Sequence, residues 1–369
     1  MAECPVTRLG QRGGLAVPGI GDGGREIGEL RVRELAQALG GRAAQLRRQV
    51  AESVHGRVVS ATDPMRALVS RPDPPYVELA EVTEPEPRSD HAVIDVKAIS
   101  LNRGEVRRLE RMDAGTIAGW DLAGTVSWPA TDGSGPKAGA RVVGLKLVGA
   151  WAEQVAVPTE FLAELPSQVS FEQAATLPVA GLTALRALEI GGFIVGKRVL
   201  ITGASGGVGR FAIQLAKLGG AHVTAVARRG EGLAELGADE VEPELSAGGD
   251  TFDVILDAIG GPVLGAALQR VAPQGTVINF GATVTEHVSY PTRELFSRAP
   301  GARLHGLYIF DELDRTRSAA ADLRRLADLV ADGRLDPQID VTVSWTEAAA
   351  AIQALLDRRV AGKAVLTVD

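Results

Sequence analysis

The stretch that decides the fold is Arg198-Val-Leu-Ile-Thr-Gly203-Ala-Ser-Gly206-Gly-Val-Gly209. Its glycines follow the spacing G-x-x-G-x-x-G, between an apolar run typical of a strand (198–202) and a helical pattern (206–218). Small residues are needed there because the chain turns tightly, the backbone approaches a pyrophosphate and the helix packs closely on the strand. The helix N-terminus then offers unpaired N–H groups and a partial positive charge to an anion. The context favours a dinucleotide-binding turn over an ordinary glycine-rich turn.

The sequence on both sides of this turn predicts an α/β protein with two kinds of sheet. Downstream, apolar strands at 222–227, 253–257 and 276–280 alternate with helical segments, which is typical of a doubly wound parallel sheet covered on both faces. Upstream, from Met65, short β-rich runs bounded by Gly, Pro and Asp are typical of a mostly antiparallel, barrel-like domain. Two helices, 318–332 and 346–359, precede a last strand, 364–368, that has no partner nearby and is expected to return to the first domain.

Composition excludes several classes of protein. The 369 residues suggest two domains, and one cysteine, Cys4, excludes a disulfide framework and multi-cysteine metal sites. The net charge of −7 lacks the basic footprint of a nucleic-acid binder, so no nucleic-acid partner is expected. No apolar run reaches the roughly 18 residues of a membrane span. These features predict a cytoplasmic protein with no membrane partner.

Residues 1–64 read as an N-terminal extension. They contain 11 of the 44 glycines and no lysine, and no run alternates like a strand. Leu35, Leu39, Leu46 and Val50 lie near helical spacing, so 29–53 is a candidate amphipathic helix interrupted by two glycines. The extension is expected to be poorly ordered or partly helical, and the alternative is a helix that docks on a partner.

The second strand of the parallel sheet indicates which nicotinamide cofactor is used. In an NAD-selective fold this strand ends at an Asp or Glu that binds the adenosine ribose, whereas here it ends at Ala227. Arg228 and Arg229 follow, and a guanidinium binds the 2′-phosphate of NADP through bidentate, charge-assisted hydrogen bonds. The pattern favours NADPH over NADH. The alternative is that both arginines are solvated loop residues.

From Met65 to Asp369 the chain resembles the medium-chain dehydrogenase/reductases, in the zinc-free quinone oxidoreductase branch that includes zeta-crystallin and enoyl-reductase domains. Besides the glycine turn, matching motifs occur in the family's order at Leu101-Asn102, Gly119-Trp-Asp121-Leu-Ala-Gly124, Ala180-Gly-Leu-Thr183, Leu236-Gly-Ala-Asp239, Asp253-Val-Ile-Leu-Asp257-Ala-Ile-Gly-Gly261, Gly275-Thr-Val-Ile-Asn-Phe-Gly281 and Gly362-Lys-Ala-Val-Leu366. The resemblance implies a GroES-like catalytic domain (65–182 and 311–369) split around a Rossmann NADP-binding domain (183–310), with the nicotinamide in the cleft between them.

The same resemblance implies site residues and a partner. The pyrophosphate would contact the glycine turn, and the nicotinamide end of the cleft would be lined by residues after two strands of the parallel sheet; Asn102 and Thr183 match positions that face the nicotinamide. The implied cofactor-binding set, with the two arginines added, is Thr183, Ser205, Gly206, Gly207, Val208, Gly209, Arg228, Arg229, Asp257, Ile259, Phe280 and Gly281. The segment 303–310 is similar to an edge strand through which family members form homodimers.

The residue inventory also bears on the reaction. The stretch from Met65 to Asp369 contains no cysteine for a catalytic zinc, so no metal is expected. This disfavours alcohol oxidation and favours reduction of a small-molecule quinone or α,β-unsaturated carbonyl by NADPH, because the conjugated carbonyl of the acceptor spreads the charge. The alternatives are a tailoring enoyl reductase acting on a bulky or carrier-bound intermediate of secondary metabolism, and a non-catalytic NADPH-binding protein.

The proton donor is not evident from the sequence. The family often places a tyrosine in the loop after the position of Asn102, but residues 103–120 contain none. Asn102 and Tyr308 are therefore weak candidates for catalysis, and solvent is the other source of the proton.

Overall fold

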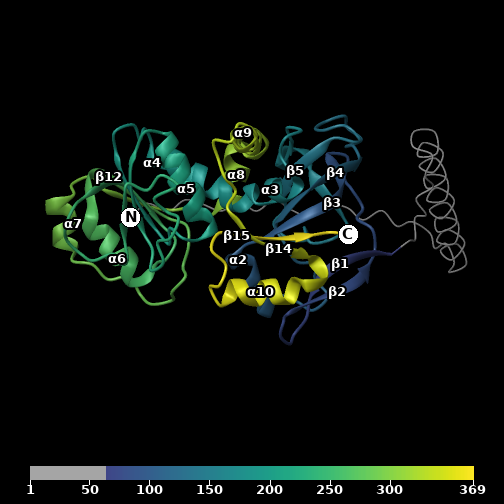
Figure 1. The fold of residues 1–369 in the computed structure, drawn as a ribbon, viewed down its shortest axis with the longest axis horizontal. Helices are drawn as coiled ribbons and strands as arrows, with labels where there is room; N and C mark the ends of the chain where they lie inside the picture. Colours follow the sequence, from purple (N-terminus) through teal and green to yellow (C-terminus); the bar gives the residue numbers. More distant parts are fainter. Residues whose placement is uncertain (1–63) are drawn as a thin grey trace, which may run out of the picture. The chain divides into compact units, whose positions relative to one another are not determined.

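The computed structural model describes residues 64–369, and the predictions for residues 1–63, including the helix at 29–53, lie outside this range. Two sheets dominate the described part, as Figure 1 shows. The parallel sheet and the mostly antiparallel sheet confirm the predicted α/β fold with Rossmann and GroES-like parts. The exact domain boundaries stay predictions. None of the helices described is long and apolar enough to cross a membrane.

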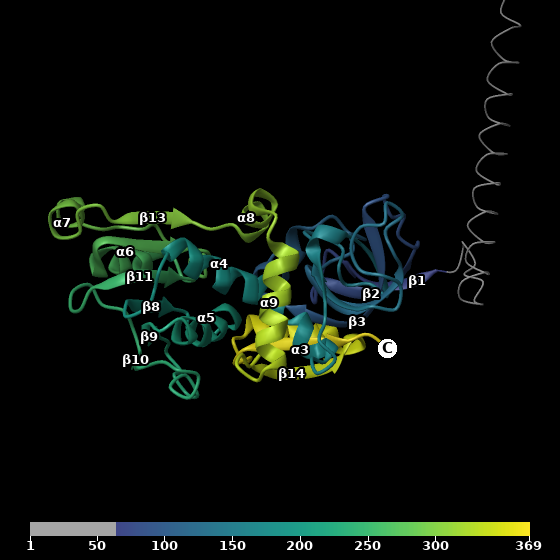
Figure 2. The same ribbon diagram turned by 90° about the horizontal axis from the view of Figure 1, so that it is seen from above.

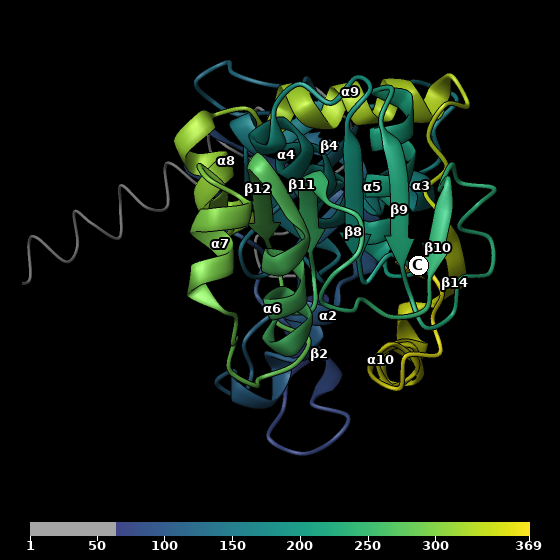
Figure 3. The same ribbon diagram turned by 90° about the vertical axis from the view of Figure 1, so that its left-hand side faces the viewer.

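The parallel sheet has six strands in the order β10-β9-β8-β11-β12-β13, and Figure 3 shows this order from β10 to β12. Alternate residues of β8 enter different cores: Val199 and Ile201 pack with Phe211 of α5, whereas Leu200 packs with Leu264 of α6. Burial on both faces explains why these strands are continuous apolar runs. The elements are β8 Arg198–Thr202, α5 Gly207–Leu218, β9 His222–Val226, β10 Glu240–Glu242, β11 Phe252–Asp257, α6 Gly261–Arg270, β12 Val271–Asn279, α7 Thr292–Arg298 and β13 Arg303–Gly306.

The second sheet has seven strands, of which six follow the order β14-β15-β3-β4-β5-β7 while β6 pairs with β3. Only β14 and β15 pair in parallel. A separate hairpin, β1 with β2, packs in the same core. The strands are β1 Met65–Ser70, β2 Val77–Val82, β3 His91–Leu101, β4 Asp121–Trp128, β5 Arg141–Leu145, β6 Gln154–Pro158, β7 Leu162–Glu164, β14 Ile339–Ser344 and β15 Lys363–Thr367.

The last strand returns to the first half of the chain, as predicted. Strand β15 pairs with β3 in antiparallel orientation, with Ala364 opposite Leu101 and Thr367 opposite Ala98. This pairing places the start of β15, at Lys363, beside the end of β3, at Leu101. Strands from the first half and from the last part of the described chain are thereby joined in one sheet.

The remaining helices lie around and between the two sheets, and Figure 2 shows α9 between them. The predicted helix 318–332 is α9, and the predicted helix 346–359 is the shorter α10, followed by Arg358 in the left-handed region at φ 60°. The helices are α2 Arg103–Val106, α3 Phe171–Ala175, a π-helical turn Leu177–Gly181, α4 Leu182–Gly191, α8 Ile309–Thr316, α9 Ala319–Ala331 and α10 Ala348–Leu356, with 3₁₀ turns at Leu109–Arg111, Thr159–Phe161 and Trp345–Glu347.

Gly119, just before β4, offers a test of this packing. Its φ is +98°, and a Cβ there would lie 1.9 Å from the ring of the buried Trp151. We expect Gly119→Ala to lower the free energy of unfolding by about 2–5 kcal/mol, because backbone strain and overpacking add. Gly115→Ala is the matched control, because the φ of Gly115 is +82° but a Cβ there would meet nothing within 4 Å. Backbone strain alone should lower its free energy of unfolding by about 1–2 kcal/mol. Urea unfolding measures both losses, and equal losses would contradict the Trp151 contact.

Candidate active site

The glycine turn between β8 and α5 needs its glycines for different reasons. Gly203 has a φ of +63°, in the left-handed region. A Cβ on Gly209 would lie 2.6 Å from the carbonyl oxygen of Ala204, so the helix can approach the turn only without a side chain there. A Cβ on Gly207 would lie 2.8 Å from Cδ of Lys363, which places β15 directly against the turn.

The turn has the properties that a pyrophosphate requires. Helix α5 begins after Gly206 with no side-chain cap and no acidic residue in its first turn. The first N–H groups of a helix have no partner within it, and here no side chain takes their place. Ser205, Gly206, Gly207 and Val208 are partly exposed around this helix start. The residues present therefore fit a dinucleotide.

Asp257, at the end of β11, uses its carboxylate within the protein. One oxygen accepts from the hydroxyl of Thr202 (2.6 Å), and the other accepts from the Gly260 N–H (2.9 Å) and from Asn279 Nδ2 (2.8 Å). The buried carboxylate thus holds together the ends of β8, β11 and β12. Its side chain supports the edge of the cleft; a contact with the cofactor stays a prediction.

The loops after β11 and β12 lie side by side at this edge. Ile259, Phe280 and Gly281 are partly exposed, and a Cβ on Gly281 would lie 2.7 Å from the carbonyl oxygen of Ala258. Thr183 is buried in the first turn of α4, and its hydroxyl donates to the carbonyl of Val179 (2.6 Å). That bond orients the Thr183 hydroxyl toward its own helix.

Arginines from three separate segments gather beside the turn. Arg228 is exposed, and Arg229 donates a hydrogen bond to the main-chain carbonyl of Arg358, in the loop before β15. Half-buried Arg103 has its pKa lowered by burial and by the like charges of Arg107 and Arg358. Within residues 64–369 no carboxylate forms an ion pair with Arg103, Arg228 or Arg358. Sequence reasoning missed Arg103 and Arg358, which no local pattern connects to the turn.

A buried polar network lies where β3, α2, β4 and β15 meet. The amide of Asn102 is its centre: Nδ2 donates to Asp121 (2.7 Å) and Glu105 (3.2 Å), and Oδ1 accepts from Lys363 Nζ (2.7 Å). Lys363 Nζ also donates to the carbonyl of Leu101 (3.0 Å) and lies 3.8 Å from Asp121 Oδ2. Asn102, a weak catalytic candidate, therefore has its side-chain amide engaged within the protein.

The ionisable members of this network have displaced pKa values. Burial raises the pKa of Asp121 from its ordinary 3.8 to about 6, although the charge of Lys363 opposes the shift. Burial and then the charge of Asp121 hold the pKa of Glu105 well above its ordinary range. Burial lowers the pKa of Lys363 against the pull of the two carboxyls. Asp121 also accepts the N–H of Val179 (3.0 Å), which connects the network to the π-helical turn.

Aromatic side chains close the wall of the cleft next to α2. The ring of Trp120 is only 9% exposed and meets Phe310 edge to face at 5.2 Å between centroids. Tyr308, the other weak catalytic candidate, is 55% exposed and its ring lies 5.7 Å from that of Phe310. A Cβ on Gly104 would lie 3.0 Å from the Trp120 ring, so a larger residue there would require this indole to shift. A cavity of about 10 Å³ remains between Glu105 and Trp120.

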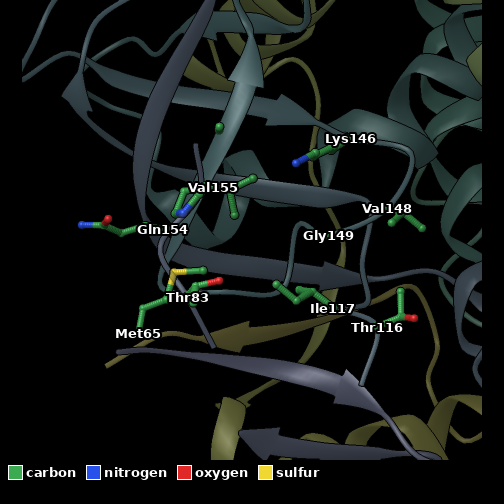
Figure 4. A pocket seen from close by; sticks show the side chains of 11 residues that line it. Met65, Thr83, Thr116, Ile117, Lys146, Val148, Gly149, Gln154 and Val155 are labelled. Carbon is green, nitrogen blue, oxygen red and sulfur yellow. The ribbon is translucent and has the colours of Figure 1, made fainter. Parts of the chain in front are cut away.

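A larger cavity of about 270 Å³ lies on the β-rich part, away from the glycine turn. Figure 4 shows its lining side chains, among them Met65, Lys146 and Gln154. Burial lowers the pKa of Lys146. Val148 lines both cavities, but only the smaller one is lined by a member of the polar network, Glu105. Among the described residues no group of three His, Cys, Asp or Glu side chains is placed to hold a metal.

The buried network makes stability depend on Lys363. The raised pKa of Asp121 means that this carboxyl stabilises the fold below pH 3.8 and that the contribution is lost as the pH rises through about 6. We expect Lys363→Met to lower the free energy of unfolding by about 3–5 kcal/mol at pH 8, where Asp121 is ionised and left unpaired, and by less at pH 5. Urea unfolding at both pH values measures the difference.

Lys217→Met is the matched control, because the exposed Lys217 pairs with Asp239 at 2.5 Å on the surface. The free energy of unfolding of Lys217→Met should be lower than that of the wild type by no more than about 1 kcal/mol at both pH values. A Lys363→Met loss that is the same at pH 5 and pH 8 would contradict the coupling to Asp121.

Comparison with known proteins identifies relatives over most of this chain. The quinone-oxidoreductase homolog of Spinacia oleracea chloroplasts is 34% identical over 241 residues, which are 58% of this chain and 73% of that protein. The chloroplast envelope quinone oxidoreductase homolog of Arabidopsis thaliana is 30% identical over 316 residues, 79% of this chain and 93% of the relative. The 2-methylene-furan-3-one reductase of Solanum lycopersicum is 34% identical over 229 residues, 56% of this chain and 58% of that enzyme.

Solved structures and a family model agree with these relatives. The quinone oxidoreductase from Coxiella burnetii superposes with a TM-score of 0.71 at 27% identity, over 83% of this chain and all of that one (100%). A family model described as zinc-binding dehydrogenase matches residues 235–366. That range, like the whole described part, contains no cysteine. Members of this family bind nicotinamide cofactors, in agreement with the uncapped glycine turn. The chain is an oxidoreductase that belongs to the medium-chain dehydrogenase/reductase superfamily, in its zinc-free quinone oxidoreductase branch.

Proposed function

We propose that this oxidoreductase uses NADPH to reduce a quinone or an α,β-unsaturated carbonyl compound. The observation that carries the proposal is the uncapped glycine turn, flanked by arginines that have no carboxylate partner in the described chain. A helix start and guanidinium groups together suit a ligand with several phosphates. No carboxylate stands at the end of β9, where Ala227 is followed by two arginines.

Different residues of the chain would bind different parts of the cofactor. Backbone N–H groups of the turn at Ser205 to Gly209 bind the pyrophosphate. Arg228 and Arg358 bind the 2′-phosphate, and Arg229 holds the Arg358 main chain in place through its carbonyl. The loops at Ile259 and Phe280 bound the nicotinamide end. Bound NADPH supplies a hydride, and the protein's part is to orient the two reactants and exclude water.

The cleft wall indicates the size of the acceptor. Trp120 packs against Gly104 and Phe310, and only about 10 Å³ stays free beside it. The packed Trp120 side chain favours a compact, conjugated acceptor over a bulky one at that point, because moving a tightly packed indole to make room would cost free energy. The names of two similar proteins, a quinone-oxidoreductase homolog and a 2-methylene-furan-3-one reductase, refer to quinones and to a methylene-furanone. Both are electron-poor acceptors of the proposed class.

NADPH oxidation in the presence of a panel of quinones and small enones tests this function. We expect turnover with NADPH, and we expect Arg358→Ala to raise the KM for NADPH roughly 10- to 100-fold while the KM for NADH changes little, since a hydrogen bond to a charged group contributes about 1.5–3 kcal/mol.

Arg359→Ala is the neighbouring control, because Arg359 pairs with Asp357 at 3.1 Å on the surface. It should leave both KM values unchanged. Equal effects of Arg358→Ala on NADPH and NADH would place the 2′-phosphate elsewhere. Tight NADPH binding without turnover of any acceptor would favour the non-catalytic alternative.

We also propose that the protein forms a homodimer through β13. This strand is the free edge of the parallel sheet, and its Leu304 is 54% exposed. An exposed edge strand with an apolar side chain invites pairing with a second copy. The glycine turn follows β8, which β11 and β12 separate from β13 in the sheet, so such a dimer leaves the turn accessible.

Leu304→Glu tests the dimer. We expect the variant to sediment as a monomer, since like charges would face each other across a two-fold edge contact. Val241→Glu is the control, because Val241 is 40% exposed on β10, the other edge of the same sheet. A wild-type monomer, or a dimer that only Val241→Glu dissociates, would contradict an interface at β13.

A further inference from the structure

Reduction of an enone requires a proton as well as a hydride, and residues 103–120 provide no tyrosine to donate it. We propose that Glu105 is the acid that protonates the α-carbon of the acceptor, through one water molecule in the cavity between Glu105 and Trp120. This inference rests on the proposed function and assigns its proton donor.

The Glu105 carboxyl has one oxygen engaged and one free. Glu105 is 3% exposed; Oε1 accepts from the backbone N–H of Asn102 (2.7 Å) and from its Nδ2 (3.2 Å). Oε2 is buried and has no hydrogen-bond partner. A buried carboxyl oxygen without a partner is costly, so a further donor or acceptor, outside the network of Asn102, Asp121 and Lys363, is needed to satisfy it.

The cavity that Glu105 lines can provide this partner. Its volume of about 10 Å³ approaches that of a single water molecule. Arg108 and Trp120 line the same cavity, and the Arg108 guanidinium lies 5.8 Å from the Trp120 ring centroid. A water there would have a polar partner on each side, Glu105 and Arg108, which is the minimum that an ordered water needs.

The charges around Glu105 favour its neutral form. Asp121 on β4 and Lys363 on β15 face it within the network, and Arg108 lies across the cavity. Ionised Glu105 would leave two carboxylates for the single ammonium of Lys363, whereas neutral Glu105 leaves one of each. Burial and the charge of Asp121 accordingly raise the pKa of Glu105. In the neutral acid Oε1 remains the acceptor for Asn102, and the unpartnered Oε2 is the oxygen that carries the proton.

The position of α2 brings this acid to the cleft. Gly104 is exposed, and Arg107 donates to the carbonyls of Ala282 (3.3 Å) and Thr283 (3.2 Å), in the loop after β12. The helix that carries Glu105 therefore lies against the loop that bounds the nicotinamide end. The ring of Trp120, on the other side of the cavity, meets Phe310.

The hydride from NADPH brings two electrons to the β-carbon of the enone, and the carbon–carbon π pair moves to give the enolate of the acceptor. The α-carbon takes a proton from the water, and the water takes one from Glu105, which becomes a carboxylate. NADP⁺ and the saturated ketone leave, and Glu105 regains a proton from solvent. A quinone takes its protons on oxygen and needs no donor on one particular face.

The test uses Glu105→Gln in the full chain with 2-methylcyclohexenone, whose α-carbon becomes a stereocentre when it is protonated. The variant keeps an acceptor for Asn102 but has no acidic proton. We expect kcat to fall roughly 100-fold or more, and the product to change from one enantiomer to a mixture, because solvent then protonates either face. The Kd for NADPH and the quinone activity should change little. If the role of Glu105 were merely structural, the substitution would also weaken NADPH binding or lower the quinone activity.

Glu110→Gln is the control, because Glu110 pairs with Arg111 on the surface, close to Glu105 in the chain. It should match the wild type. Infrared spectra of the proteins supply a readout that needs no turnover. The band of a protonated carboxyl at neutral pH should be present in the wild type and in Glu110→Gln, and absent in Glu105→Gln.

Unchanged enantiomeric purity and kcat in Glu105→Gln, with an active wild type, would overturn the assignment of Glu105 alone. Identical infrared spectra for wild type and Glu105→Gln would overturn it as well. A wild type that reduces no enone or quinone would instead overturn the proposed function, and this inference with it.

Discussion

The buried ammonium of Lys363 holds together the parts of this protein that meet at the cleft. It donates to the carbonyl of Leu101 at the end of β3 and to the side chain of Asn102, and it lies near the carboxylate of Asp121 at the start of β4. Its aliphatic stem packs against Gly207 of the glycine turn. A charge this deeply buried is tolerated only where it has both a counter-ion and hydrogen-bond acceptors, so each of these elements is confined to one arrangement.

This constraint explains the topology of the split domain. The chain leaves the antiparallel sheet, forms the whole parallel sheet and then returns through β15, which pairs with β3. The return brings Lys363 to the turn between β8 and α5 and brings Arg358 to Arg229. Residues from the last part of the chain thus meet the glycine turn and the end of β9, which the parallel sheet alone would leave uncovered.

The reactive side of the cleft is built without a metal-ligating cysteine. Glu105 and Asp121 are buried close to one lysine, Trp120 fills the wall against Gly104, and a small cavity lies between Glu105 and Trp120. Reduction of an acceptor whose own carbonyl spreads the incoming charge needs less charge stabilisation from the site than oxidation of an alcohol, because no alkoxide has to be stabilised. A neutral carboxyl in a low-dielectric wall is suited to proton transfer at neutral pH.

The amino-acid sequence by itself determined the local features: the glycine turn, the parallel strands with their helices, and the missing carboxylate after β9. These follow from backbone conformation and hydrophobic period, which depend on neighbours along the chain. Only the tertiary structure decided that the amide of Asn102 is consumed within the protein, that the hydroxyl of Thr183 turns back to Val179, and that Glu105 has a free oxygen beside a cavity. Lys363 and Leu101 are 262 positions apart. The energy of such contacts comes from burial and the charges it brings together, and neither exists until the sheets have closed.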